Sequence, residues 1–67
     1  MSRDKLLSEA KKLGYKVSED KVIFKVGDFT IDESGADVLV YEKDKKVYST
    51  YSPVSAYTYV YGLITAP

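Results

Sequence analysis

The 67-residue chain contains no cysteine and no histidine, and these two absences narrow its chemistry. Without cysteine, no disulfide can stabilise so small a protein, and this absence is typical of the cytosol. Without histidine as well, a zinc site would need carboxylates alone, which suit that metal poorly. The commonest acid–base and nucleophilic side chains of enzymes are missing too. We therefore expect a cytoplasmic protein that binds no metal or cofactor and catalyses no reaction.

The acidic residues also lack the spacing of known sites. Two adjacent pairs occur, Glu19-Asp20 and Asp32-Glu33, but both fall in polar connecting segments, where carboxylates are usually solvated. The aspartates do not follow the calcium-loop pattern with its central glycine and terminal glutamate. The chain has no glycine-rich phosphate loop and no nucleophile elbow, which again favours a non-enzymatic protein.

The net charge is zero, with ten basic and ten acidic residues. Proteins that bind duplex DNA or RNA are usually strongly basic and mimics of DNA are strongly acidic, so neither class fits. Little charge repulsion opposes self-association. No apolar signal-peptide core follows the first methionine, and Pro53, Gly62 and several hydroxyl residues interrupt the C-terminal third. We therefore expect no association with a membrane.

Charge is absent from the last third of the chain, since no charged residue follows Lys46. Five of the seven tyrosines lie in this segment. Tyrosine is enriched at protein interfaces, and charge is depleted from interface centres. We therefore predict that tyrosines of this segment contact a partner. They are Tyr48, Tyr51, Tyr57, Tyr59 and Tyr61.

Residues 2–13 have the pattern of an amphipathic helix, with apolar residues on one face and charged or polar residues elsewhere. The residues of the apolar face are Leu6, Leu7, Ala10 and Leu13. Ser2 suits the N-cap position. Gly14 suits the left-handed position just after a helix end, which lets Tyr15 pack back near Ala10. We expect this apolar face to belong to the core.

Four segments between residues 22 and 51 are predicted strands, from their apolar–polar alternation or their many β-branched and aromatic residues. They are Val22–Val26, Phe29–Asp32, Val38–Glu42 (which could begin at Asp37) and Val47–Tyr51. Gly27-Asp28 predicts a tight turn after the first, although the second is short enough to be an extended loop. The polar run Lys43–Lys46 should form the solvated tip of a hairpin between the last two. Residues 16–20 are expected to be a polar connection.

Residues 54–64 fit two structures. As a strand, the segment would place its alternating tyrosines on one face. As a helix, it would have Ser52 as its N-cap and Pro53 as its first residue. Helical geometry also gathers the small and polar residues on one narrow stripe, and this segregation decides for the helix. The stripe consists of Ser55, Thr58, Gly62 and Thr65.

Together these elements predict one α+β domain that spans residues 1–67. An N-terminal amphipathic helix and a C-terminal helix should pack on the same face of a three- to four-stranded antiparallel sheet. The C-terminal helix is apolar around most of its circumference, so part of it must meet Leu6 and Leu7 or another chain. In that helix, Tyr59 should point about 160° away from Tyr61.

The leading interpretation is a small protein-binding module that binds another protein or itself, as a homodimer. Inhibitors, adaptors and accessory factors of this size are also encoded by phage and other mobile elements. The alternative is a single-stranded nucleic-acid binder in which Tyr48, or Tyr41 with Tyr51, stacks on bases. Its phosphate contacts would come from Lys25, Lys43, Lys45 and Lys46. Because acidic residues balance these lysines, we rank protein binding first.

Overall fold

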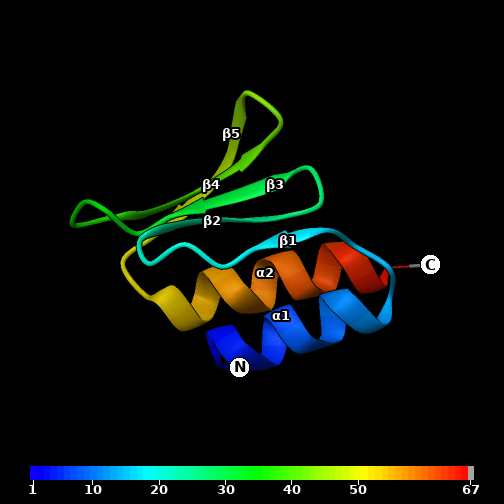
Figure 1. Cartoon of the computed structure of the whole chain (residues 1–67). Coiled ribbons are helices and arrows are strands. Elements are labelled where there is room, and N and C mark those ends of the chain that lie inside the picture. Colours follow the sequence, from blue (N-terminus) through cyan, green and yellow to red (C-terminus); the bar gives the residue numbers. More distant parts are fainter. Residues whose placement is uncertain (67) are drawn as a thin grey trace.

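The computed structural model describes residues 1–66. Within them, five strands form one antiparallel sheet, and two helices cover one of its faces (Figure 1). The elements are α1 (Arg3–Lys12), β1 (Val17–Ser18), β2 (Ile23–Val26), β3 (Phe29–Asp32), β4 (Val38–Glu42), β5 (Lys45–Thr50) and α2 (Pro53–Thr65). The predicted α+β class, with a helix at each end of the chain, is confirmed.

Helix α1 begins and ends where the sequence predicts. The Ser2 hydroxyl accepts a hydrogen bond from the Lys5 amide (3.1 Å) and so satisfies one of the free N–H groups of the first turn. After the helix, Gly14 has a left-handed φ of +88°. The Tyr15 amide donates to the Ala10 carbonyl (3.0 Å), which is the long hydrogen bond of a Schellman motif. The predicted return of the chain toward Ala10 is confirmed.

The sheet is a meander in which each strand pairs with the next. Its strand count corrects the prediction of three or four, because residues 16–20 are more than a polar connection. Val17 and Ser18 pair with β2, and the Val17 side chain packs against the core. A two-residue strand has too little alternation for a sequence pattern to reveal it. Segment β3 is a strand and not an extended loop, since it pairs with β2 and β4 along its whole length.

The hairpin of β4 and β5 is longer than predicted. Only Lys43 and Asp44 form its turn, with Lys43 at a φ of +57°, and Glu42 pairs directly with Lys45. The run Lys43–Lys46 is therefore not one loop tip, because its second half begins the strand. Opposite charges on Glu42 and Lys45 favour this cross-strand pair. The strand ends at Thr50, one residue earlier than predicted.

The last element is a helix, as the segregation of its small and polar residues predicts. The Ser52 hydroxyl accepts a hydrogen bond from the Ser55 amide (3.4 Å), and Pro53 occupies the first turn. Most of the predicted polar stripe is exposed: Thr58, Gly62 and Thr65. The opposite side of the helix enters the core through Ala56, Tyr57, Val60 and Ile64.

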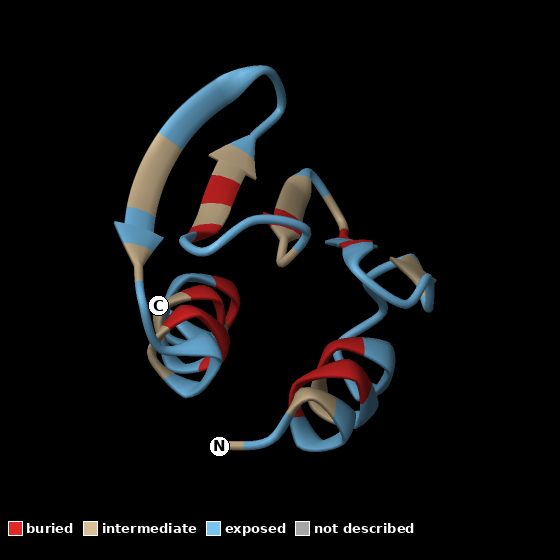
Figure 2. Ribbon diagram, turned by 90° about the vertical axis from the view of Figure 1, so that its left-hand side faces the viewer, coloured by how far each residue is buried: buried red, intermediate tan, exposed pale blue. Residues whose placement is uncertain are grey.

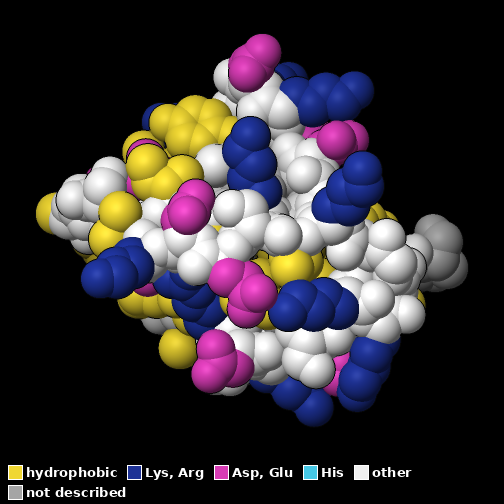
Figure 3. All heavy atoms as spheres, viewed as in Figure 1, with side chains coloured by type: hydrophobic (Ala, Val, Ile, Leu, Met, Phe, Trp, Pro, Cys, Tyr) yellow, Lys and Arg dark blue, Asp and Glu magenta, His cyan; other side chains and the backbone are white. Residues whose placement is uncertain are grey.

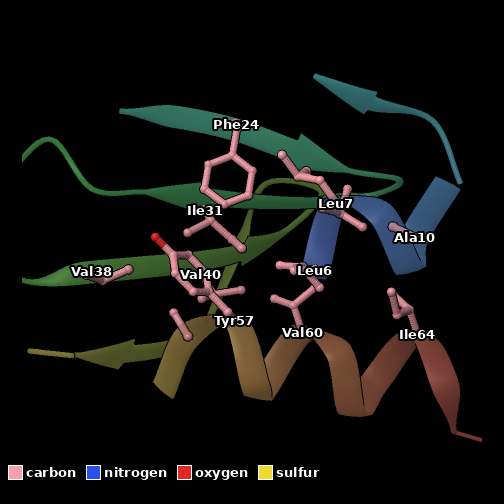
Figure 4. Packing of buried hydrophobic residues seen from close by; sticks show 12 residues of the cluster. Leu6, Leu7, Ala10, Phe24, Ile31, Val38, Val40, Tyr57, Val60 and Ile64 are labelled. Carbon is pink, nitrogen blue, oxygen red and sulfur yellow. The ribbon is translucent and has the colours of Figure 1, made fainter. Parts of the chain in front are cut away.

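One hydrophobic cluster fills the space between the sheet and the two helices (Figure 4). In Figure 2 the buried residues appear as bands in the arched sheet and on the sides of both helices that face it. The sheet contributes Phe24, Val26, Ile31, Val38 and Val40, and α1 contributes Leu6, Leu7 and Ala10. The predicted contact of α2 with the apolar face of α1 is thus part of this core.

Leu13, which was predicted to face the core, and Val22, the first residue of a predicted strand, are both exposed. Leu13 is 52% exposed because α1 ends at Lys12 and the chain turns away at Gly14. Val22 is exposed as well, since β2 begins only at Ile23.

Tyr15 connects three parts of the fold. Its hydroxyl lies 3.5 Å from the Ile64 carbonyl near the end of α2, to which it donates. Its ring covers Gly27 in the turn between β2 and β3, where a Cβ atom would lie only 2.7 Å from the ring. Gly27 also has a φ of +58°. The turn therefore requires glycine both for its backbone and for the close approach of Tyr15.

Candidate interaction surface

Strand β5 is an outer edge of the sheet, and among residues 1–66 only β4 pairs with it. An edge strand presents unpaired backbone N–H and C=O groups that can pair with a strand from another chain. In Figure 2 this edge forms the rim of the arch on the side of α2. Lysines often protect such edges, but here they occupy only the first two positions, Lys45 and Lys46.

A β-bulge divides β5. Tyr41 pairs with Lys46 and Val40 pairs with Tyr48, so Val47 is an additional residue on this strand. Directly paired residues share a face of the sheet. Tyr48 therefore points to the helix side with its buried partner Val40, and Lys46 points to the open side with Tyr41. Beyond the bulge, Ser49 is again on the open side and Thr50 on the helix side, opposite Val38.

Beneath the edge, Tyr48 of β5 stacks on Tyr59 of α2. Their ring centroids lie 4.2 Å apart and the ring planes differ by 5°. The two rings form one wall of a groove of about 350 Å³, which Val54, Ser55 and Thr58 complete. The groove therefore runs between the sheet edge and the exposed side of α2.

The groove continues into an exposed uncharged region. Tyr51 is 85% exposed and Val54 is 51% exposed, and Leu63 lies one helical turn after Tyr59. The edge of β5 and these neighbours are called the β5/α2 surface below; its side chains are Tyr48, Tyr51, Val54, Ser55, Thr58, Tyr59 and Leu63. By contrast, Figure 3, seen from the side of α1 and β1, shows basic and acidic side chains interleaved.

The structure brings together three of the five tyrosines predicted to contact a partner, namely Tyr48, Tyr51 and Tyr59. Tyr57 is only 7% exposed and lies in the core. Tyr61 is half-buried, on the side of α2 away from Tyr59, as the helical geometry predicts. The ring of Tyr59 lies against Tyr48 rather than free in solvent. Contact of these tyrosines with a partner stays a prediction.

Tyr57 has a structural role at one end of the core. Its ring lies 6.1 Å from that of Phe24, and its hydroxyl donates a 2.6 Å hydrogen bond to the Glu33 carboxylate. Burial of the hydroxyl raises the pKa of Tyr57 to about 12, and the hydrogen bond and negative charge of Glu33 add to this effect. The nearby Arg3 guanidinium opposes the shift only weakly.

The raised pKa of Tyr57 predicts a loss of stability in alkali. Because the pKa of Tyr57 in the folded state is about 12 and that of an unfolded tyrosine is ~10, its stabilising effect is complete below pH ~10 and is lost as the pH rises toward 12. Urea unfolding at a series of pH values should show a loss of about 1–2 kcal/mol in the wild type relative to Tyr57→Phe. Parallel pH profiles for the two proteins would contradict this assignment.

A second hollow, of about 320 Å³, lies at the end of β5. It is lined by Asp37, Ser49, Thr50 and Tyr51. Asp37 comes just before β4, and the pairing of Val38 with Thr50 brings it there. The hollow therefore places one carboxylate at the C-terminal end of β5, while Lys45 and Lys46 lie at the N-terminal end.

The open face of the sheet, away from the helices, carries several of the residues that the single-stranded nucleic-acid hypothesis requires. Lys25, Thr30, Tyr41 and Lys46 are directly paired across β2 to β5 and form one row. Tyr48, which the alternative also invoked, lies on the other face. The neighbouring row includes Asp32, and hydrogen bonds from the Ser34 hydroxyl and amide (2.6 and 2.9 Å) hold the pKa of Asp32 below its usual value. This carboxylate is thus ionised at neutral pH and would repel phosphate.

Residues 1–66 contain neither a candidate metal site nor a membrane-spanning helix. No three acidic side chains there come close enough to hold a metal ion together. No helix in the same part of the chain has the length and apolar character needed to cross a bilayer.

Comparison of the chain with protein families, curated proteins and solved structures gives no match. The role of the β5/α2 surface is therefore inferred from its geometry and composition alone. Of its residues, the sequence did not single out Val54 or Leu63, although Val54 borders the predicted polar stripe of the helix. The predicted hairpin already brings Asp37 near the end of the strand that becomes β5, and the register of β4 with β5 fixes its position there.

Proposed function

We propose that this protein is a small protein-binding module whose contact region is the β5/α2 surface. The observation that carries the proposal is that the outer edge of β5, which no strand of residues 1–66 pairs with, lies beside a groove walled by a stacked tyrosine pair. An added strand would gain backbone hydrogen bonds from β5, and side chains of the partner would enter the groove. Such strand addition combines affinity from the backbone with specificity from the pockets.

The composition of the surface supports the same function. Apart from Lys45 and Lys46 at the start of β5 its side chains are uncharged, and Tyr51, Val54 and Leu63 are exposed to solvent. Aromatic and uncharged side chains are typical of the centres of protein interfaces. The stacked pair also holds Tyr48 and Tyr59 in fixed positions, so few side-chain rotations need be lost when a partner binds.

A single charge placed in the groove tests this proposal. Thr58 is exposed, lines the groove and makes no side-chain hydrogen bond among residues 1–66, so Thr58→Glu should fold normally. Affinity capture with the wild type should retain a protein whose recovery falls about tenfold or more with Thr58→Glu, since a buried unpaired charge is costly. Ser8→Glu, on the exposed side of α1, is the matched control and should leave recovery unchanged. Equal recovery with both variants would overturn the proposal.

The row of Lys25, Tyr41 and Lys46 is the specific observation that favours the second candidate, single-stranded nucleic-acid binding. The aromatic ring of this row could stack on one base while the two lysines contact phosphates. Quenching of tyrosine fluorescence by oligonucleotides, weakened by salt and lost in Tyr41→Ala, would favour this candidate. The ionised Asp32 on the same face is the reason we place it second.

A further inference from the structure

We infer that the partner of the β5/α2 surface is a second copy of this chain, joined by antiparallel pairing of the two β5 strands. This inference rests on the proposed function, because it uses the same edge and groove. It adds the identity of the partner, the direction of the strands and the residues that face one another.

The distribution of charge along β5 is the first argument. Its N-terminal end carries Lys45 and Lys46, and its C-terminal end lies beside Asp37 in the hollow that Tyr51 also lines. When two such strands pair antiparallel, the basic end of each copy lies against the acidic end of the other. The hollow then offers a lysine both a carboxylate and an exposed aromatic ring. The edge is therefore complementary to itself, and a two-fold axis makes each contact twice.

The bulge is the second argument, because it sets a register that suits a two-fold axis. Lys46 and Ser49 lie on the open face on either side of Tyr48, which points to the helix side. With Val47 as the additional residue, a register centred on Tyr48 brings Lys46 of one copy opposite Ser49 of the other. Lys45 then lies opposite Thr50, and both pairs match in face. Without the bulge, a register centred on Tyr48 would pair Lys46 with Thr50 instead of Ser49, since the two faces of a strand alternate at every position.

The groove is the third argument. In this register Tyr48 meets Tyr48 of the second copy at the axis, with each Tyr59 stacked beneath. The groove beside each pair, with Val54 and Thr58, then faces the corresponding helix of the other copy. No charged residue lies in this central part, so identical surfaces meet without repulsion. The result is one continuous sheet across two chains, in which the exposed edge no longer exists.

Charge exchange provides the decisive experiment. Lys46→Glu and Asp37→Lys each place like charges against one another twice in a homodimer. Size-exclusion chromatography with light scattering should show a dimer for the wild type and a dissociation constant about tenfold or more higher for each variant. An equimolar mixture of the two variants should restore the dimer to within about threefold of the wild type, because positions 46 and 37 then carry opposite charges at both contacts of the mixed dimer. Lys25→Glu makes the same charge change away from the edge and should dimerise normally.

Introduced cysteines test the register, since the chain has none of its own. A mixture of Lys46→Cys and Ser49→Cys should form a cross-linked dimer under mild oxidation, because directly opposed residues in antiparallel strands lie about 4.5–5.5 Å apart at Cα. Each variant alone should cross-link at least about fivefold more slowly, because its own cysteines are not opposed in this register. Equal rates in the mixture and in both single variants would overturn the register.

The outcomes separate this inference from the proposed function. If the wild type stays monomeric at high concentration yet captures a protein that Thr58→Glu loses, the inference of a homodimer is overturned and the protein-binding function stands. A stable dimer that neither charge variant weakens overturns the pairing of β5 strands. A monomer whose captured proteins are unaffected by Thr58→Glu overturns both.

Discussion

Replacing Phe24 with alanine should lower the free energy of unfolding by about 3–5 kcal/mol. Phe24 is fully buried at the centre of the face that β2 turns to the helices. Its ring lies 6.1 Å from that of Tyr57 and supports the Arg3 guanidinium, whose central carbon is 4.2 Å from the ring centroid. The substitution therefore removes the packing of an aromatic side chain, leaves a cavity and ends a cation–π contact.

The neighbouring Ile23 provides a control within the same strand. It lies on the open face of the sheet and is 42% exposed, so Ile23→Ala should cost less than about 1 kcal/mol. Urea unfolding followed by circular dichroism measures both variants. All samples should be compared at one chain concentration, because a dimer would make the unfolding midpoint depend on concentration. A similar loss of unfolding free energy for the two alanine variants would contradict the burial of Phe24 and the exposure of Ile23 on opposite faces of β2.

Replacing Leu6 with alanine should lower the free energy of unfolding by about 2–5 kcal/mol. Leu6 is fully buried where α1 meets α2, and it points toward Val60 in Figure 4. Domains of this size have a net stability of only a few kcal/mol. A large fraction of Leu6→Ala molecules should therefore be unfolded at room temperature.

Leu13→Ala is the matched control for Leu6, with the same change of side chain on the same segment. Leu13 is the C-cap residue of α1 and faces solvent, so its replacement should change stability by less than about 0.5 kcal/mol. Thermal melting would show the difference directly. An unchanged melting temperature for Leu6→Ala would mean that α1 does not pack on α2 as the structure shows.

Most of the fold follows from local sequence signals. Ser2 and Gly14 bound the first helix, Gly27-Asp28 sets the first hairpin, and Ser52-Pro53 begins the last helix. Each of these signals acts through a hydrogen bond or a backbone angle within a few residues, so the chain elsewhere does not alter it. Boundaries that depend on a neighbouring strand were wrong. Lys45 and Lys46 joined β5 because Glu42 and Tyr41 lie opposite them, and no local pattern contains that pairing.

The sequence predicted the composition of the candidate surface but not its position in the fold. The absence of charge after Lys46 and the concentration of tyrosines there indicated an interface. Only the folded chain separates those tyrosines, since Tyr57 enters the core while Tyr48 and Tyr59 stack with each other. That separation arises because α2 packs against β5. Tyr48 and Tyr59 lie in different elements, so no periodic pattern in the sequence links them.

By itself, the sequence determined the class of fold, the two helices, their caps, the four main strands and the uncharged character of the C-terminal third. These properties depend on residue type and on local geometry. The tertiary structure alone decided that β5 is an exposed edge, that a bulge at Val47 sets its faces, and which residues of β5 lie beside Asp37. All three depend on which strands pair and in what register, and register is fixed by the packing of one face of the sheet against both helices at once.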